Sequence, residues 1–123
     1  MADTNKQFDQ VTAKCRRIFI DKMQDYGPSW RIFRLHGITD QLYIKACNIR
    51  QRQESGVSLV GDDIEGNLRA IVNYGVTAII QSRNGYADAI DMTNERATQL
   101  YDEVLQEAKD LMLRKNHDYG EAW

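Results

Sequence analysis

A nine-residue motif that occurs twice is the feature that most constrains this chain. The pattern Lys-x-x-Asp-Tyr-Gly-x-x-Trp spans residues 22–30 and returns at residues 115–123, an offset of 93 residues. Upstream of the motif, apolar or small residues match at the same offset: Phe8 with Tyr101, Val11 with Val104, Cys15 with Ala108, Ile18 with Leu111, and Phe19 with Met112. The sequence therefore predicts an internal duplication.

The duplication suggests how the chain is organised. Residues 1–92 would form a first repeat of three helices, and residues 93–123 the first helix of a second repeat, packed in the same bundle. Because the second copy stops at its last motif residue, Trp123, we expect a truncated piece of a longer protein. The alternative is a single retained helix that completes the bundle.

Composition is that of one soluble domain. The 123 residues are 42% hydrophobic and 28% charged, values that are ordinary for a globular protein. We expect a cytoplasmic protein, because no apolar run could cross a bilayer and the N-terminus lacks the apolar core of a signal peptide. Cys15 and Cys47 lie on apolar faces of predicted helices, which favours two buried, reduced thiols over a disulfide or a zinc pair.

Apolar residues recur at helical spacing in four segments, and no strand-like alternation occurs. The predicted helices cover residues 5–25, 40–54, 62–84 and 94–117. Their predicted N-caps are Thr4, Thr39, Asp62, and Thr93 or Asn94. Gly27-Pro28, Ser55-Gly56 and Asn84-Gly85 are expected to end the first three. The third is the most apolar and should be central, so the predicted fold is an all-α four-helix bundle.

The repeated motif has two interpretations. In the structural one, Gly releases the helix, Trp folds back as an apolar plug, and Asp bonds amides of the turn. In the functional one, Tyr26 or Trp30 stacks on a nucleotide base, while Lys22, with Arg31 or Arg34, holds phosphate.

Charge is spread unevenly along the chain. Residues 14–52 carry a net charge of +6 and residues 53–123 one of −7. This asymmetry is consistent with an anion site in the first part, or with two parts that neutralise each other across the folded surface. Trp30, Phe33 and Tyr43 are interleaved with the basic residues, as in a nucleic-acid surface. The overall charge of −2 and the lack of a helix-turn-helix or finger pattern argue against nucleic acid.

An acidic cluster and two histidines complete the candidate groups. Asp62, Asp63 and Glu65 could hold Mg²⁺ against the phosphates of a substrate, or serve as capping residues in a first helical turn. His36 and His117 lie in predicted turns without a nucleophile nearby in sequence. We expect both imidazoles to be exposed to solvent.

Three sequence elements together resemble the nucleotide modification associated domain 1 family, a domain of unknown function. They are the motif at residues 22–30, the segment Leu42-Tyr43-Ile44-Lys45 with Ile49-Arg50, and the run from Asp62 to Gly75. The resemblance covers most of residues 14–80. That family is in turn similar to the MazG-like all-α nucleoside triphosphate pyrophosphohydrolases.

The MazG-like resemblance implies an oligomeric helical bundle. Its carboxylates, on two neighbouring helices, would bind Mg²⁺ and split nucleoside triphosphates into monophosphate and pyrophosphate. From the resemblance to related domains we expect acidic residues at intervals of about four positions along the third helix. Here Asp62 fills the first such position, whereas Gly66 and Ala70 fill the next two, and the second helix offers only Asp40.

We therefore expect nucleotide binding rather than turnover in a homo-oligomer, and the catalytic residues are left unassigned. Lys22, Lys45 and Arg50 would bind phosphate, Tyr26 or Trp30 would stack on the base, and Asp62 and Glu65 would hold Mg²⁺. The alternative is a non-enzymatic helical module for interaction or oligomerisation.

Overall fold

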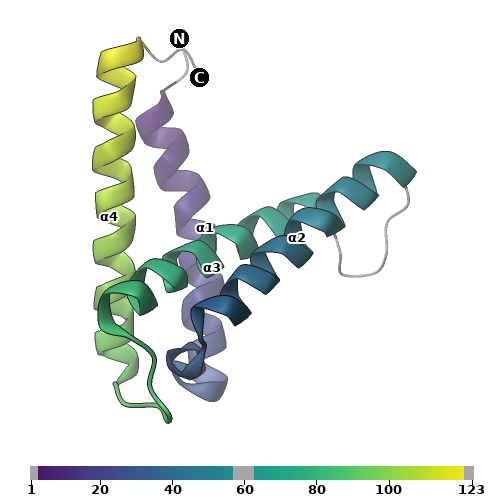
Figure 1. Cartoon of the computed structure of the whole chain (residues 1–123). Helices are drawn as coiled ribbons and strands as arrows, with labels where there is room; N and C mark the ends of the chain where they lie inside the picture. The colour runs from purple at the N-terminus through teal and green to yellow at the C-terminus, as the bar shows by residue number, and fades with distance from the viewer. Residues whose placement is uncertain (1–2, 57–62, 121–123) are drawn as a thin grey trace.

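The computed structural model describes residues 3–56 and 63–120, which form four long helices and one short 3₁₀ helix (Figure 1). The elements are α1 (Thr4–Tyr26), η1 (Ser29–Ile32), α2 (Leu35–Ser55), α3 (Ile64–Asn84) and α4 (Asn94–Tyr119). These ranges contain no strand, so the predicted all-α class with four main helices is confirmed. No helix in the described part of the chain has the length and apolarity needed to cross a membrane.

Helices α1 and α4 lie side by side and antiparallel (Figure 1). Arg16 pairs with Asp102 at 2.7 Å and Lys109 with Asp9 at 2.9 Å. At the far end of the pair, the side-chain amide of Asn116 donates to the Thr4 hydroxyl at 2.6 Å. The ion pairs are partly exposed, so they contribute little to stability and chiefly define the register of the two helices.

Helix α3 packs against each of the other three long helices, which confirms its predicted central position. It forms an antiparallel hairpin with α2, and this hairpin crosses the α1–α4 pair (Figure 1). Among the residues of α2 only Ile38 is fully buried, with 1% of its surface exposed. Most of α2 therefore depends on α3 alone for its packing.

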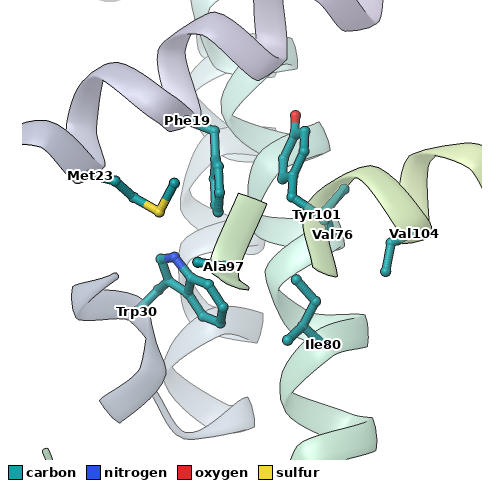
Figure 2. Packing of buried hydrophobic residues seen from close by; sticks show 8 residues of the cluster. All are labelled: Phe19, Met23, Trp30, Val76, Ile80, Ala97, Tyr101 and Val104. Carbon is teal, nitrogen blue, oxygen red and sulfur yellow. The ribbon is translucent and has the colours of Figure 1, made fainter. Parts of the chain in front are cut away.

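Three aromatic rings form the centre of the core where α1, η1 and α4 meet. The ring of Phe19 stacks on Tyr101 at a centroid distance of 4.3 Å and meets Trp30 at 5.9 Å. Five smaller side chains surround them: Met23, Val76, Ile80, Ala97 and Val104 (Figure 2). Aromatic residues bury large apolar areas, so this cluster is the main apolar contact that joins the first helix to the last.

The predicted helix ends at glycine are confirmed. Gly27, Gly56 and Gly85 are the C-caps of α1, α2 and α3. Both copies of the motif end a helix at the Tyr, and the Gly that follows has a φ of +65° at position 27 and +61° at position 120. A left-handed φ is open to Gly but strained for residues with a side chain.

Three of the predicted N-caps are wrong, and Thr93 is confirmed. The cap of α1 is Asp3 rather than Thr4, since its carboxylate accepts from the Lys6 amide at 3.1 Å. The cap of α3 is Asp63, which accepts from the Gly66 amide at 2.6 Å. The predicted cap, Asp62, lies outside the described residues. In both cases the N-cap is an Asp directly next to the predicted residue: Asp3 instead of Thr4, and Asp63 instead of Asp62.

Helix α2 begins at Leu35, several residues before the predicted start. Thr39 is inside the helix, where its hydroxyl donates to the carbonyl of Leu35 at 3.0 Å. Burial of Ile38 against the rest of the protein holds this first turn in place, so neither Gly37 nor the absence of a side-chain cap at Arg34 prevents helix formation.

Both cysteines are free thiols. The predicted burial is confirmed for Cys15 and is wrong for Cys47, which is exposed. The reason is the position of α2 at the edge of the fold, where the face that carries Tyr43 and Cys47 turns to solvent. His36 and His117 are exposed, as predicted, but they lie in α2 and α4 rather than in turns.

A buried amide joins η1 to α3. Gln81 is 2% exposed, and its Nε2 lies within hydrogen-bond distance of the carbonyl oxygens of Trp30, Arg31 and Phe33, at 3.2, 2.9 and 2.9 Å. Its Oε1 accepts a hydrogen bond from the guanidinium of Arg31. The carbonyls of Trp30 and Arg31 also accept from the backbone amides of Phe33 and Ala87, so the buried amide of Gln81 supplements these bonds and is the described donor to the carbonyl of Phe33.

We predict that Gln81→Leu lowers the free energy of unfolding by about 2 kcal/mol, because the carbonyl of Phe33 loses its described donor and the buried guanidinium of Arg31 loses one of its acceptors. Urea unfolding followed by far-UV circular dichroism measures the change. The control is Gln53→Leu on the exposed surface of α2, which should stay within about 0.5 kcal/mol of wild type. A loss below about 1 kcal/mol for Gln81→Leu would contradict the role given to this amide.

Candidate functional site

A pocket of about 340 Å³ lies between the end of α1, the η1 turn and α3. Lys22 and Tyr26 line it from α1, where their spacing of four places them on one face of the helix. Trp30 lines it from η1, and Arg69 and Tyr74 line it from α3. Its volume is within the range of small-molecule sites.

The charged groups of the pocket are basic. Lys22 and Arg69 line it, and none of the described lining residues is a carboxylate. Lys22 is exposed and forms no ion pair with any described residue, whereas Arg69 pairs with Glu65 at 2.8 Å. The pocket therefore favours an anion, which could bind Lys22 directly and compete with Glu65 for Arg69.

Aromatic side chains border the same space. Tyr26 is 76% exposed, so its ring face is open at the mouth of the pocket, and the half-buried Tyr74 lies on α3. Trp30 differs because only 7% of its surface is exposed, and Phe19 packs against its ring. The rings that the pocket offers to a ligand for stacking are thus those of Tyr26, Phe33 and Tyr74 rather than Trp30.

Small residues on α3 leave the space that forms the pocket. Gly66 and Ala70 line it one helical turn apart and bring no functional group. Asn73 follows them, and its amide is held on both sides. Its Oδ1 accepts from the Tyr101 hydroxyl at 2.6 Å, and its Nδ2 donates to the Cys15 carbonyl at 3.0 Å. These two bonds fix the orientation of the Asn73 side chain on this wall of the pocket.

A second pocket of about 350 Å³ lies farther along the α1–α3 contact and shares Arg69 with the first. Lys14, Cys15 and Glu65 are among its lining residues. Burial raises the pKa of the Cys15 thiol above its ordinary value. The thiol is therefore protonated at neutral pH and is not an activated nucleophile.

The structure brings together three of the residues that the sequence nominated as substrate-binding, namely Lys22, Tyr26 and Trp30. Lys45 and Arg50 are on α2 and are not among the described residues that line either pocket. Sequence reasoning missed Arg69 and Tyr74. The available signal was the polar set Arg69, Asn73 and Thr77, which recurs at four-residue spacing along an otherwise apolar helix.

Arg31, also nominated for phosphate binding, is buried away from the pocket. Its guanidinium makes two hydrogen bonds to Asp91, at 2.9 and 3.2 Å. It also donates to the carbonyl of Gly85 at 2.6 Å and to Gln81. This set of partners ties η1 to the segment between α3 and α4 and engages all three nitrogen atoms of the guanidinium.

The carboxylates nominated for metal binding are engaged elsewhere or lie outside the described residues. Asp63 caps α3, Glu65 pairs with Arg69, and Asp62 is not described. Within residues 3–56 and 63–120, no three His, Cys, Asp or Glu side chains lie close enough to hold a metal ion. The described donor set does not form a metal centre.

Together these features define an all-α domain with a basic, aromatic pocket between its first and third long helices. Residues 22–82 match the model of the nucleotide modification associated domain 1 family. The matched segment contains the motif, η1, α2 and nearly all of α3, which include most of the pocket wall. No curated protein and no solved structure gave a match.

The Arg31–Asp91 pair predicts a specific pH dependence. The hydrogen bond from Arg31 holds the pKa of Asp91 below its ordinary value of 3.8, so the folded protein binds this proton less readily than the unfolded chain does. The pair therefore stabilises the fold fully above about pH 5, and the contribution is lost as pH falls through the lowered pKa.

We expect Asp91→Asn to be less stable than wild type at pH 6, with the difference shrinking steadily toward pH 2. Urea unfolding at a series of pH values measures it. Asp25→Asn, at an exposed position without an ion pair among the described residues, should match wild type at pH 6. A gap between Asp91→Asn and wild type that is independent of pH would contradict the role of the ion pair.

Proposed function

We propose that the pocket between α1, η1 and α3 binds a nucleotide. The observation that carries the proposal is the meeting of two cations, Lys22 and Arg69, with the exposed ring of Tyr26 and the half-buried ring of Tyr74, in a pocket whose described wall contains no carboxylate. Phosphate would bind the cations by charge-assisted hydrogen bonds, and the base would stack on the tyrosines. The family name, which associates the domain with nucleotide modification, supports the same ligand class.

The proposal is one of binding, and no hydrolytic step is part of it. Mg²⁺ would enter with the phosphates of the ligand, and Glu65 is the described carboxylate that adjoins Arg69. That carboxylate is already balanced by the guanidinium, and Gly66 and Ala70 add no acidic group along α3. Such a set could bind a nucleotide without activating a water molecule for attack on phosphorus.

We expect that some nucleoside mono- or triphosphates, tested as a panel with and without Mg²⁺, raise the melting temperature of the protein. A ligand at ten times its Kd should raise it by about 5 °C, since it binds only the native state. Lys22→Met and Tyr26→Ala should each weaken binding about five- to tenfold, through a lost charged contact or a lost stacking surface. Differential scanning fluorimetry and isothermal titration calorimetry give the two measurements.

The repeated motif provides matched controls. Lys115 and Tyr119 occupy the same motif positions at the end of α4 and are exposed, but neither is among the described lining residues of the pocket. Lys115→Met and Tyr119→Ala should therefore leave affinity unchanged. The absence of any thermal shift across the panel at millimolar concentration would refute nucleotide binding, and equal losses in the control variants would refute this pocket as its site.

We also infer a second role, self-association through α2. This helix buries only Ile38 completely, and it exposes Leu35, Ile44 and 71% of Tyr43 to solvent. Apolar and aromatic groups exposed along one helix are typical of an interaction surface. This observation favours the interpretation of the chain as a helical oligomerisation module, which is compatible with nucleotide binding elsewhere.

We expect light scattering coupled to gel filtration to give a mass above the 14.2 kDa of one chain at high micromolar concentration. The double variant Tyr43→Ser and Ile44→Ser should return the mass to that of a monomer. The control is Tyr86→Ser, which removes an exposed tyrosine outside α2 and should not alter the mass. A wild-type chain that stays monomeric at millimolar concentration would exclude this role.

A further inference from the structure

Helices α1 and α4 correspond to each other in the contacts that join them. At the offset of 93 residues, Arg16 corresponds to Lys109 and Asp9 to Asp102. The ion pair Arg16–Asp102, at 2.7 Å, therefore becomes the ion pair Lys109–Asp9, at 2.9 Å, when the two helices are exchanged. Such reciprocal contacts are those of two equivalent elements related by a two-fold axis, and the antiparallel arrangement of the helices permits that axis (Figure 1).

The α2–α3 hairpin occupies one of the two places that this two-fold relation defines. Val76 and Ile80 of α3 pack with Phe19 from the second half of α1 and with Tyr101 and Val104 from the first half of α4. Figure 1 shows the hairpin across this half of the pair, whereas the half in which α1 begins and α4 ends lies away from it. The two-fold relation carries the hairpin site onto that other half.

The side chains at the equivalent positions of the other half are also apolar, but they are more exposed. Val104 is 5% exposed, whereas Val11, its equivalent in α1, is 56% exposed. Leu111, the equivalent of Ile18, is 47% exposed. We call this surface the uncovered face, and it consists of Phe8, Val11, Leu111 and Met112, which are equivalent to Tyr101, Val104, Ile18 and Phe19.

The uncovered face borders a groove along the side of α3. The second pocket, of about 350 Å³, is lined by Val11 from α1 and by Leu68 and Val72 from α3, and Leu68 is 49% exposed. A helix laid on the uncovered face would lie beside α3 and cover this groove. Neighbouring apolar side chains that remain exposed in this way are typical of a surface that binds another protein element.

We infer that the uncovered face docks a second helical hairpin of the α2–α3 kind, which packs through a stripe like that of Val76 and Ile80. The equivalent half of the α1–α4 pair already binds such a hairpin through the same kind of apolar side chains, so the same type of partner fits both halves. A second copy of this chain cannot supply it without opening its own core, because its α3 already packs on its own α1 and α4.

Docking would give the second copy of the motif the neighbours that the first copy has. Lys22 and Tyr26 face α3 across a pocket, whereas Lys115 and Tyr119 are exposed at the end of α4. A hairpin on the uncovered face would place a helix equivalent to α3 beside Lys115 and Tyr119. This inference concerns the partner of the fold and holds whichever ligand the first pocket binds.

The inference is tested by adding the hairpin to the full chain. A second copy of residues 31–85 is joined directly after Trp123, because the same segment follows Trp30 in the first motif. The matched control carries Val76→Glu and Ile80→Glu in the added copy alone. Chymotrypsin should cut the added hairpin about tenfold more slowly than the control, since cleavage follows the population of the open form. The melting temperature should be higher than that of the control by about 5 °C.

A second pair of variants locates the docking site. Val11→Glu combined with Leu111→Glu should change the melting temperature of the 123-residue chain by less than about 2 °C, because both side chains are exposed. In the extended chain the same two substitutions should remove the protection of the added hairpin. Ala13→Glu, at an exposed position on the opposite side of α1 from Val11, should leave that protection intact.

Three outcomes would overturn the inference. The first is cleavage of the extended chain and its control at equal rates. The second is protection that survives Val11→Glu with Leu111→Glu, which would place the added hairpin elsewhere. The third is an oligomer of the 123-residue chain that these two substitutions convert to a monomer in light scattering, because the uncovered face would then bind a second copy. None of these measurements depends on nucleotide, so a failure of nucleotide binding is distinguished from a failure of docking.

Discussion

The buried amide of Gln81 is the interaction on which the candidate site depends. The η1 turn lies outside the long helices, and its backbone is only partly paired by amides: the carbonyl of Trp30 accepts from Phe33 and that of Arg31 accepts from Ala87. The side-chain amide of Gln81 lies within hydrogen-bond distance of these two carbonyls and is the described donor to the carbonyl of Phe33. Arg31 in turn forms an ion pair with Asp91. These contacts hold Trp30 against Phe19 in the core and thereby build one wall of the pocket.

The two copies of the motif show how tertiary context gives the same residues different roles. Lys22 and Tyr26 end α1 next to η1 and α3, and there they line a pocket. Lys115 and Tyr119 end α4 and are exposed. In both copies the Gly after the Tyr ends the helix with a positive φ. The helix-ending part of the motif is thus local, whereas the capacity to bind a ligand requires α3 as a neighbour.

The accuracy of the sequence-based predictions differed between the two ends of the helices. The glycine ends were correct because a left-handed φ is a property of one residue. The starts were wrong where several capping residues compete, as for Asp3 and Thr4, or where packing overrides the cap, as for Ile38 in the first turn of α2. Cys47 was misplaced for a related reason, since apolar spacing does not reveal that a helix packs on one neighbour alone.

The sequence by itself determined the helical class, the four main helices, the central position of the most apolar one and the role of the motif as a helix end. All of these follow from periodicity and turn chemistry within a few residues. Only the tertiary structure decided which polar groups meet. Arg31 turns away from a ligand because Asp91, 60 residues later, binds it, and Arg69 faces Lys22 because α3 packs on α1. Contacts between residues so far apart in sequence depend on how helices cross, and local spacing does not encode the crossing.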